Sequence, residues 1–109
     1  MTVQRYGSVI KLKVEKLQEY KELHADVWPD VLAMIRACHI RNYSIYFKDG
    51  YLFSYYEYHG DDLSADMERM AADPEVQRWW AECKPCFEQI DDLPPGEVWA
   101  SMESVFYQE

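Results

Sequence analysis

The chain has 109 residues, of which 49% are apolar and 16% aromatic, and its formal net charge is -9. This length and apolar content predict one globular domain over residues 1–109, and they exclude intrinsically disordered and collagen-like chains. Phosphate backbones and anionic lipids would repel so acidic a protein, so we expect neither nucleic acid nor a membrane as a partner.

The first predicted strand and helix differ in the spacing of their apolar residues. Residues 8–14 alternate apolar and polar side chains, the period of a strand with one face in the core. Over residues 16–38, apolar side chains recur at steps of three and four, which predicts an amphipathic helix. Pro29 lies within that stripe and lacks the amide hydrogen that a helix interior uses, so we expect a kink or a split there.

A hairpin and a second helical region are predicted next. Residues 41–47 and 51–58 are dense in Tyr, Phe and Ile, and Gly50 between them is free to take positive φ in a turn. Apolar residues from Met67 to Cys83 are interrupted by Asp73 and Pro74, which predicts two short helices or one broken helix. A Pro-rich loop at 91–96 and a closing strand at 99–107 complete the chain.

The predicted order β-α-β-β-α-β indicates an α+β fold. Four strands and two helices of this length form a ferredoxin-like sandwich, in which an antiparallel sheet carries both helices on one face. The other face would then expose many Tyr and Phe side chains, and large exposed apolar surfaces mark partner or ligand sites. We therefore expect a homodimer that forms through the sheet and leaves an aromatic cavity.

Tyr20 and His24 are the first candidates for chemistry. They are four residues apart on the predicted helix, so their side chains lie on the same face. Histidine exchanges protons near pH 7, which suits a general acid or base. A lone histidine on an apolar stripe is nevertheless more often a core residue with satisfied hydrogen bonds, and the spacing leaves both interpretations open.

The adjacent Trp79 and Trp80 are the second candidates. Neighbouring side chains on a helix point about 100° apart, so both cannot face the same core layer. One of them is expected to line another surface. Flat indole rings suit the C–H face of a sugar, while wedging of both rings against the sheet explains the pair equally well.

The remaining reactive side chains form no recognisable motif. Cys83 and Cys86 come at the end of a helical stripe, where a thioredoxin-like motif is not expected, and a zinc site would need a second ligand pair. His39 and His59 follow predicted elements and are interpreted as surface or capping residues. The three histidines have no metal-ligand spacing, and the aspartate pair at 61–62 lacks the spacing of a calcium loop.

Apolar segments and cysteines indicate the cellular compartment. No stretch approaches the roughly 18 consecutive apolar residues of a membrane span, and the first residues lack the apolar segment of a secretion signal. Three cysteines are an odd and sparse set, which favours free thiols over a disulfide framework. We therefore expect a cytoplasmic protein.

Separated segments of the chain resemble the L-rhamnose mutarotase family over residues 11–107. They are EYKELH at 19–24 with VWP at 27–29, IRNYSIY at 40–46, DPEVQRWW at 73–80 and MESVFY at 102–107. The resemblance implies a small dimeric ferredoxin-like protein that interconverts the α and β anomers of a deoxy sugar by acid–base ring opening. It implies no metal and no organic cofactor.

The resemblance also implies a role for each candidate. The proton-donating histidine of the family matches His24, its sugar-contacting tyrosines match Tyr20 and Tyr43, and its paired tryptophans match Trp79 and Trp80. The implied substrate is a monosaccharide, L-rhamnose or a related sugar such as L-fucose, because exchanging one deoxyhexose for another needs only a reshaped pocket wall.

The chain also departs from the family at a few positions. Members often have Gly or Asn at positive φ where the first long helix ends, and His39 stands there in this chain. Val98 precedes Trp99 where a second Trp is common, and Tyr107 stands where many members have His.

Other functions stay open on the same fold. One is a non-catalytic sugar-binding module, and another is a cofactor-free monooxygenase or haem-handling enzyme of the dimeric α/β-barrel type. A third is an interaction module, whose cavity would be filled by side chains of the partner subunit.

Overall fold

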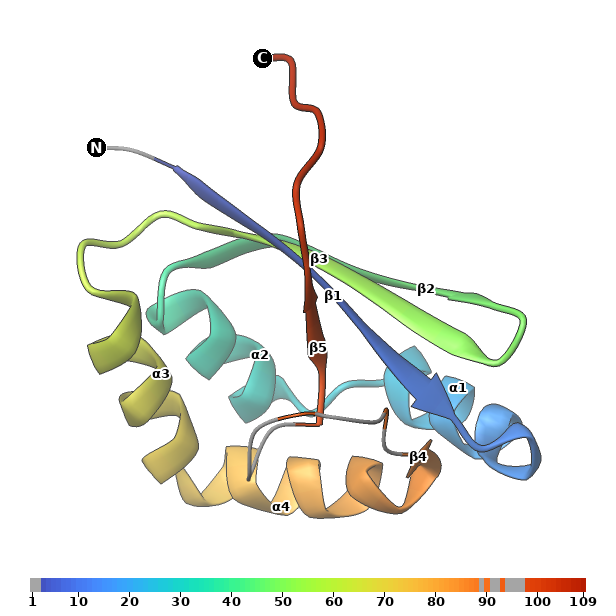
Figure 1. The fold of residues 1–109 in the computed structure, drawn as a ribbon. Helices are drawn as coiled ribbons and strands as arrows, with labels where there is room; N and C mark the ends of the chain where they lie inside the picture. The colour runs from blue at the N-terminus through green and yellow to red at the C-terminus, as the bar shows by residue number, and fades with distance from the viewer. Residues whose placement is uncertain (1–2, 89, 91–92, 94–97) are drawn as a thin grey trace.

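The chain builds one antiparallel sheet and lays its helices against one face of it (Figure 1). The structure is a computed structural model that describes residues 3–88, 90, 93 and 98–109. Its strands are β1 (Gln4–Leu12), β2 (Ile40–Lys48), β3 (Tyr51–Tyr58), β4 (Phe87–Glu88) and β5 (Ala100–Met102). Its helices are α1 (Leu17–Ala25), α2 (Pro29–Ala37), α3 (Leu63–Ala72) and α4 (Pro74–Cys83), with 3₁₀ turns η1 (Val14–Lys16) and η2 (Lys84–Cys86).

The order of the strands is that of a ferredoxin-like sheet. It runs β2-β3-β1-β4, and β5 also pairs with β1. Each of these pairings is antiparallel. The α+β ferredoxin-like fold predicted from the chain is therefore confirmed, with the closing strand beside β1 and the hairpin of β2 and β3 on the other side.

Prolines divide both predicted helical regions. Pro29 begins α2 and Pro74 begins α4, where a missing amide hydrogen costs nothing. Asp73 caps α4, because its Oδ2 accepts a hydrogen bond of 3.0 Å from the amide of Val76. The expected split at Pro29 is confirmed. Among the described residues, no helix combines the length and the apolar character needed to cross a membrane.

Two predicted strands have different bounds in the structure. The first begins at Gln4 and ends at Leu12, since Val14 already starts a 3₁₀ turn and is 77% exposed. The closing strand predicted over 99–107 is only Ala100–Met102, because residues 103–109 leave the sheet and pair with none of the described strands (Figure 1). The predicted loop at 91–96 lies, apart from Leu93, outside the described residues.

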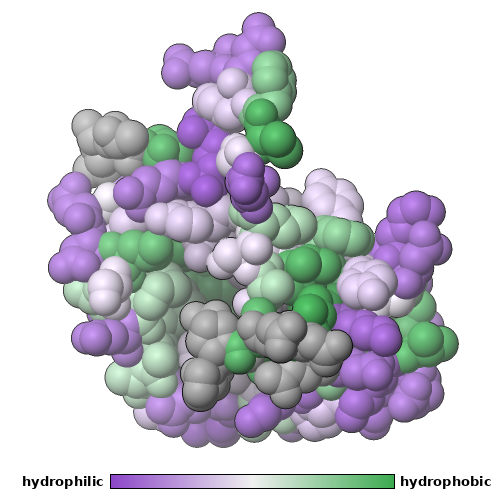
Figure 2. Space-filling view, in the orientation of Figure 1, coloured by the Kyte–Doolittle hydropathy of each residue, from purple (hydrophilic) through white to green (hydrophobic). Residues whose placement is uncertain are grey.

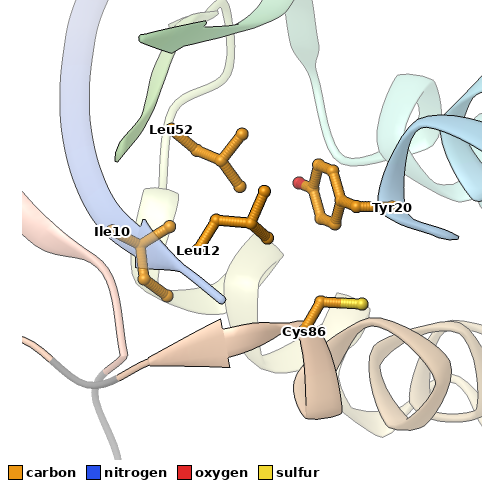
Figure 3. Packing of buried hydrophobic residues seen from close by; sticks show 5 residues of the cluster. All are labelled: Ile10, Leu12, Tyr20, Leu52 and Cys86. Carbon is orange, nitrogen blue, oxygen red and sulfur yellow. The ribbon is translucent and has the colours of Figure 1, made fainter. Parts of the chain in front are cut away.

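The core lies between the sheet and the helices. Ile10 and Leu12 of β1 and Leu52 of β3 point toward α1, where the ring of Tyr20 packs against them, and Cys86 closes the cluster from η2 (Figure 3). Burying these side chains contributes about 1.5–3 kcal/mol each. Tyr20 is thereby fixed between the sheet and its helix.

The opposite face of the sheet is rich in exposed aromatic side chains. Tyr46 is 67% exposed and stands opposite Phe53 in the register of β2 and β3, and Tyr51 is also exposed. The predicted aromatic outer face is therefore present. On this face β1 places Val9 opposite Phe53, and at its far end Arg5 opposite Glu57.

Candidate active site

A cavity of about 460 Å³ lies between the inner face of the sheet and the helices. Figure 2 shows a hollow on this side of the molecule, ringed by apolar residues. The predicted site residues all line the cavity, namely Tyr20, His24, Tyr43, Trp79 and Trp80. The expected aromatic cavity is thus formed by residues of one chain, between its helices and its sheet.

His24 takes its orientation from its own helix. Its Nδ1 lies 3.0 Å from the carbonyl oxygen of Tyr20, one turn earlier in α1. A carbonyl only accepts, so Nδ1 donates and Nε2 is left with the lone pair. Burial lowers the pKa of His24 below its usual 6.5, against a smaller opposing effect of the hydrogen bond to Tyr20. The imidazole is therefore neutral near pH 7, with Nε2 able to accept a proton.

Aromatic rings hold the imidazole from two sides. The ring of Tyr20 stacks on it at 4.1 Å between centroids, and Trp79 meets it edge-on at 5.2 Å. Trp79 is 6% exposed and packs in turn against Trp28, whereas Trp80 is 46% exposed. The two adjacent tryptophans do differ as their spacing predicts, one supporting the histidine from the core and the other presenting an open wall.

Three tyrosine hydroxyls are available in the cavity. Tyr20, Tyr43 and Tyr56 line it, and none of their hydroxyls hydrogen-bonds to a protein group within the described part of the chain. Burial raises the pKa of Tyr43 to about 12, and it raises the pKa of Tyr20 and Tyr56 as well. These phenols stay protonated at neutral pH and can donate or accept hydrogen bonds.

Tyr56 is a lining residue that the sequence analysis missed. It belongs to the inner face because Ser54 and Tyr58, two residues to either side on β3, are buried there. The alternation of side chains along the hairpin shows that Tyr56 faces inward only when it is known which residues of β3 are buried. Lys84 and Cys83, at the end of α4, also line the cavity and were not selected from the sequence for it.

The other reactive groups have structural surroundings. His39, with a φ of 67°, ends α2 and hydrogen-bonds through Nδ1 to Asp66 at 2.9 Å, as expected of a capping residue. All three cysteines are buried and unpaired, and burial raises the pKa of Cys83 to about 12, which keeps it a thiol. Within residues 3–88, 90, 93 and 98–109, no three His, Cys, Asp or Glu side chains gather as a metal site.

Comparison with known proteins identifies the family. A sequence model described as L-rhamnose mutarotase matches residues 5–108 of the chain. The chain belongs to the L-rhamnose mutarotase family. The L-rhamnose mutarotases of Shouchella clausii and Bacillus subtilis are each 32% identical to it, over 94% and 96% of this chain and 96% and 98% of those proteins. Mutarotases are isomerases, so this member of the family is an enzyme of that class.

Solved structures agree with the fold of this L-rhamnose mutarotase family member. The crystal structure of an L-rhamnose mutarotase from Formosa agariphila has a TM-score of 0.76 and 27% identity, and the match covers 97% of this chain and 99% of that one. A tetracenomycin F2 cyclase from Streptomyces glaucescens, at 14% identity and a TM-score of 0.67, shares the fold alone.

Proposed function

We propose that this protein interconverts the α and β anomers of L-rhamnose. The observation that carries the proposal is the placement of His24 in one cavity with three tryptophans, Trp99 among them, and three tyrosines. The cavity volume of about 460 Å³ suffices for a monosaccharide, which is smaller than the drug-sized ligands of pockets in this range. The match of the chain to the family and to named L-rhamnose mutarotases supports the same substrate.

The lining suits a deoxy sugar on its polar and apolar sides. The open indole of Trp80 matches the C–H surface and the methyl group of the sugar, while the mostly buried Trp79 lines the cavity beside His24. The hydroxyls of Tyr20 and Tyr43 match its hydroxyl groups, since they lack protein partners within the described residues. L-fucose differs from L-rhamnose in the orientation of hydroxyls rather than in size, so we include it as a second substrate to be tested.

His24 moves the protons. In ring opening, the anomeric hydroxyl loses a proton and becomes the aldehyde oxygen, while the bond from C1 to the ring oxygen breaks and that oxygen gains a proton. Neutral Nε2 accepts the first proton, and the imidazolium donates the second, because both oxygens are bonded to C1 and lie within reach of one nitrogen. Rotation about the bond from C1 to C2 and the reverse transfers close the ring on the other face.

The neighbours of His24 favour this role over tyrosine as the base. The raised pKa of Tyr20 and of Tyr43 makes both phenols poor proton acceptors at neutral pH, so they orient the sugar. The face of the Tyr20 ring, which stacks on the imidazole, stabilises the transient imidazolium through cation–π attraction.

A homodimer is part of the proposal. The outer face of the sheet exposes Tyr46 and Phe53, and beyond β5 the chain exposes Val105 at 91% and Phe106 at 81%. A second copy that covers this face removes both apolar surfaces from water. Sedimentation velocity at micromolar concentration tests this, with Tyr46→Lys as the variant expected to dissociate. A wild-type monomer would contradict it.

We also propose a cytoplasmic location. The three cysteines are buried thiols with no disulfide between them, as in proteins of reducing compartments. Fractionation of cells that express the protein, with detection by mass spectrometry, tests the location. Recovery from the secreted fraction would contradict it.

Saturation-transfer NMR of equilibrated L-rhamnose tests the catalytic proposal directly. We expect added protein to accelerate exchange between the anomeric protons, and His24→Ala to reduce that acceleration by about a hundredfold or more, the usual value of positioned acid–base catalysis. His39→Asn is the matched control, because His39 lies outside the cavity and Asn accepts positive φ. Sugar binding by calorimetry without faster exchange would instead identify a binding module.

A further inference from the structure

We infer that Asn42 and Glu57 are positioning residues, which hold a bulge in β2 and thereby turn Tyr43 into the cavity. Both side chains belong to the outer face of the sheet, on the far side from the cavity, and neither lines it. The inference rests on the proposed function, since it assigns the residues that aim one of the sugar-contacting hydroxyls.

The bulge is visible in the pairing of β2 with β3. The register shifts between Arg41 and Ser44, so that residues 42–43 stand opposite the single residue Tyr56. Two residues opposite one define a β-bulge, which inserts an extra residue and re-aims the side chains beyond it.

Without the bulge, Tyr43 would point to the wrong face. Ile40 is buried on the inner face, and strict alternation from Ile40 would send residues 41, 43 and 45 outward. The extra residue inverts this alternation, so Tyr43 and Ile45 line the cavity while Tyr46 is exposed on the outer face. The placement of the Tyr43 hydroxyl therefore depends on one irregular residue.

Asn42 is that irregular residue. Its φ of 51° lies in the left-handed region, which costs most side chains about 1–2 kcal/mol and which Asn enters more readily. Its side-chain Nδ2 donates a hydrogen bond of 2.9 Å to Oε1 of Glu57 across the strands. The backbone conformation of the bulge is thus tethered to β3 through a charge-assisted hydrogen bond.

Other hydrogen bonds hold the Glu57 carboxylate in place as the acceptor for Asn42. Its Oε1 also accepts from Nε2 of His59 at 3.1 Å, and its Oε2 accepts from the hydroxyl of Tyr55 at 2.8 Å. These hydrogen bonds, with that from Asn42 as the largest cause, lower the pKa of Glu57 to about 2. The carboxylate therefore stays charged far below neutral pH, and its hydrogen bonds fix its orientation.

Fluorine NMR of protein labelled with 3-fluorotyrosine reports the placement of Tyr43 directly, and Tyr43→Phe assigns its resonance. We expect Glu57→Ala and Asn42→Ala to shift and broaden that resonance and to weaken L-rhamnose binding by up to about tenfold, the upper value of one neutral hydrogen bond between the Tyr43 hydroxyl and the sugar. Tyr55→Phe is the matched control, because it removes a hydrogen bond to Glu57 without touching the bulge, and Glu57→Gln retains an acceptor for Asn42. Both should leave the resonance in place and affinity within about twofold.

A double-mutant cycle separates positioning from general loosening of the fold. If Glu57 acts through Tyr43, then Glu57→Ala changes L-rhamnose affinity less than about twofold when Tyr43 is already Phe. An unmoved Tyr43 resonance in Glu57→Ala, or an equal loss of affinity in the Tyr43→Phe background, overturns the inference.

A substitute variant and an independent readout complete the experiment. Should Glu57→Ala fail to fold, Asn42→Gly replaces it, because Gly keeps the left-handed backbone and deletes only the tether, so the resonance is again expected to broaden. Wild-type protein that neither binds L-rhamnose nor accelerates its anomer exchange refutes the proposed function, while the fluorine resonance still decides whether Asn42 and Glu57 position Tyr43.

Discussion

Removing single hydroxyls from Tyr20 and from Tyr58 separates sugar binding from folding. Tyr20 lines the cavity, and its hydroxyl has no hydrogen-bond partner among the described residues. In contrast, the hydroxyl of Tyr58 donates to Oδ2 of Asp66 at 2.5 Å and accepts from the amide of Asp62 at 3.0 Å, away from the cavity. We therefore expect Tyr20→Phe to affect the ligand and Tyr58→Phe to affect the fold.

The magnitudes follow from these partners. Tyr20→Phe deletes one neutral hydrogen bond to the sugar, about 0.5–1.5 kcal/mol, or about 2- to 13-fold in Kd for L-rhamnose. Its free energy of unfolding should change by less than about 0.5 kcal/mol. Tyr58→Phe removes two hydrogen bonds and leaves the Asp62 amide without its partner, so we expect Tm to fall by about 5 °C or more with Kd unchanged.

Calorimetric titration with L-rhamnose and thermal melts followed by circular dichroism measure both quantities on each variant. The reasoning is refuted if Tyr20→Phe lowers Tm as much as Tyr58→Phe does while its Kd stays at the wild-type value. That result would mean that the Tyr20 hydroxyl serves packing rather than the ligand.

Further outcomes are expected on changing the pH, on replacing the tryptophans and on alkylating the cysteines. The lowered pKa of His24 predicts that kcat/KM stays constant above about pH 6.5 and falls at lower pH, since imidazolium cannot accept the anomeric proton; a rise on acidification would contradict this. Stability should decline in the same direction, because the unfolded chain binds the proton more tightly than the folded one. Trp80→Ala should raise KM with a smaller effect on kcat and little change in Tm, because Trp80 is 46% exposed, whereas the buried Trp79 should cost about 3–5 kcal/mol of stability as Ala. Cys38, Cys83 and Cys86 should be alkylated by iodoacetamide only after unfolding, as seen by mass spectrometry; rapid labelling of native protein would show that burial does not protect them.

Local patterns predicted the parts of the site that depend on one helix. The four-residue spacing of Tyr20 and His24 gives their stacking and their shared face directly, and Pro29 alone gives the split of the helix. Both follow from the geometry of a single helix and need no partner strand.

Features that depend on how the strands pair could not be predicted from the sequence. The inward turn of Tyr43 requires a bulge, and the lining role of Tyr56 follows from which face of β3 is buried. The closing strand was predicted too long because residues 103–107 have strand composition but no partner strand in the part of the chain that the structure describes. Pairing is a property of two segments, so composition of one segment cannot supply it.

The single layer of β-sheet separates two working surfaces by the thickness of one polypeptide backbone. Asn42 and Tyr43 are neighbours in sequence, yet one belongs to the aromatic side that would meet another molecule and the other to the cavity. A substitution on the outer face of the sheet, made to control assembly, can therefore also alter the wall of the cavity. We expect substitutions at Tyr46 and Phe53 to leave the cavity unchanged, and substitutions at residues 42 and 57 to displace Tyr43 from it.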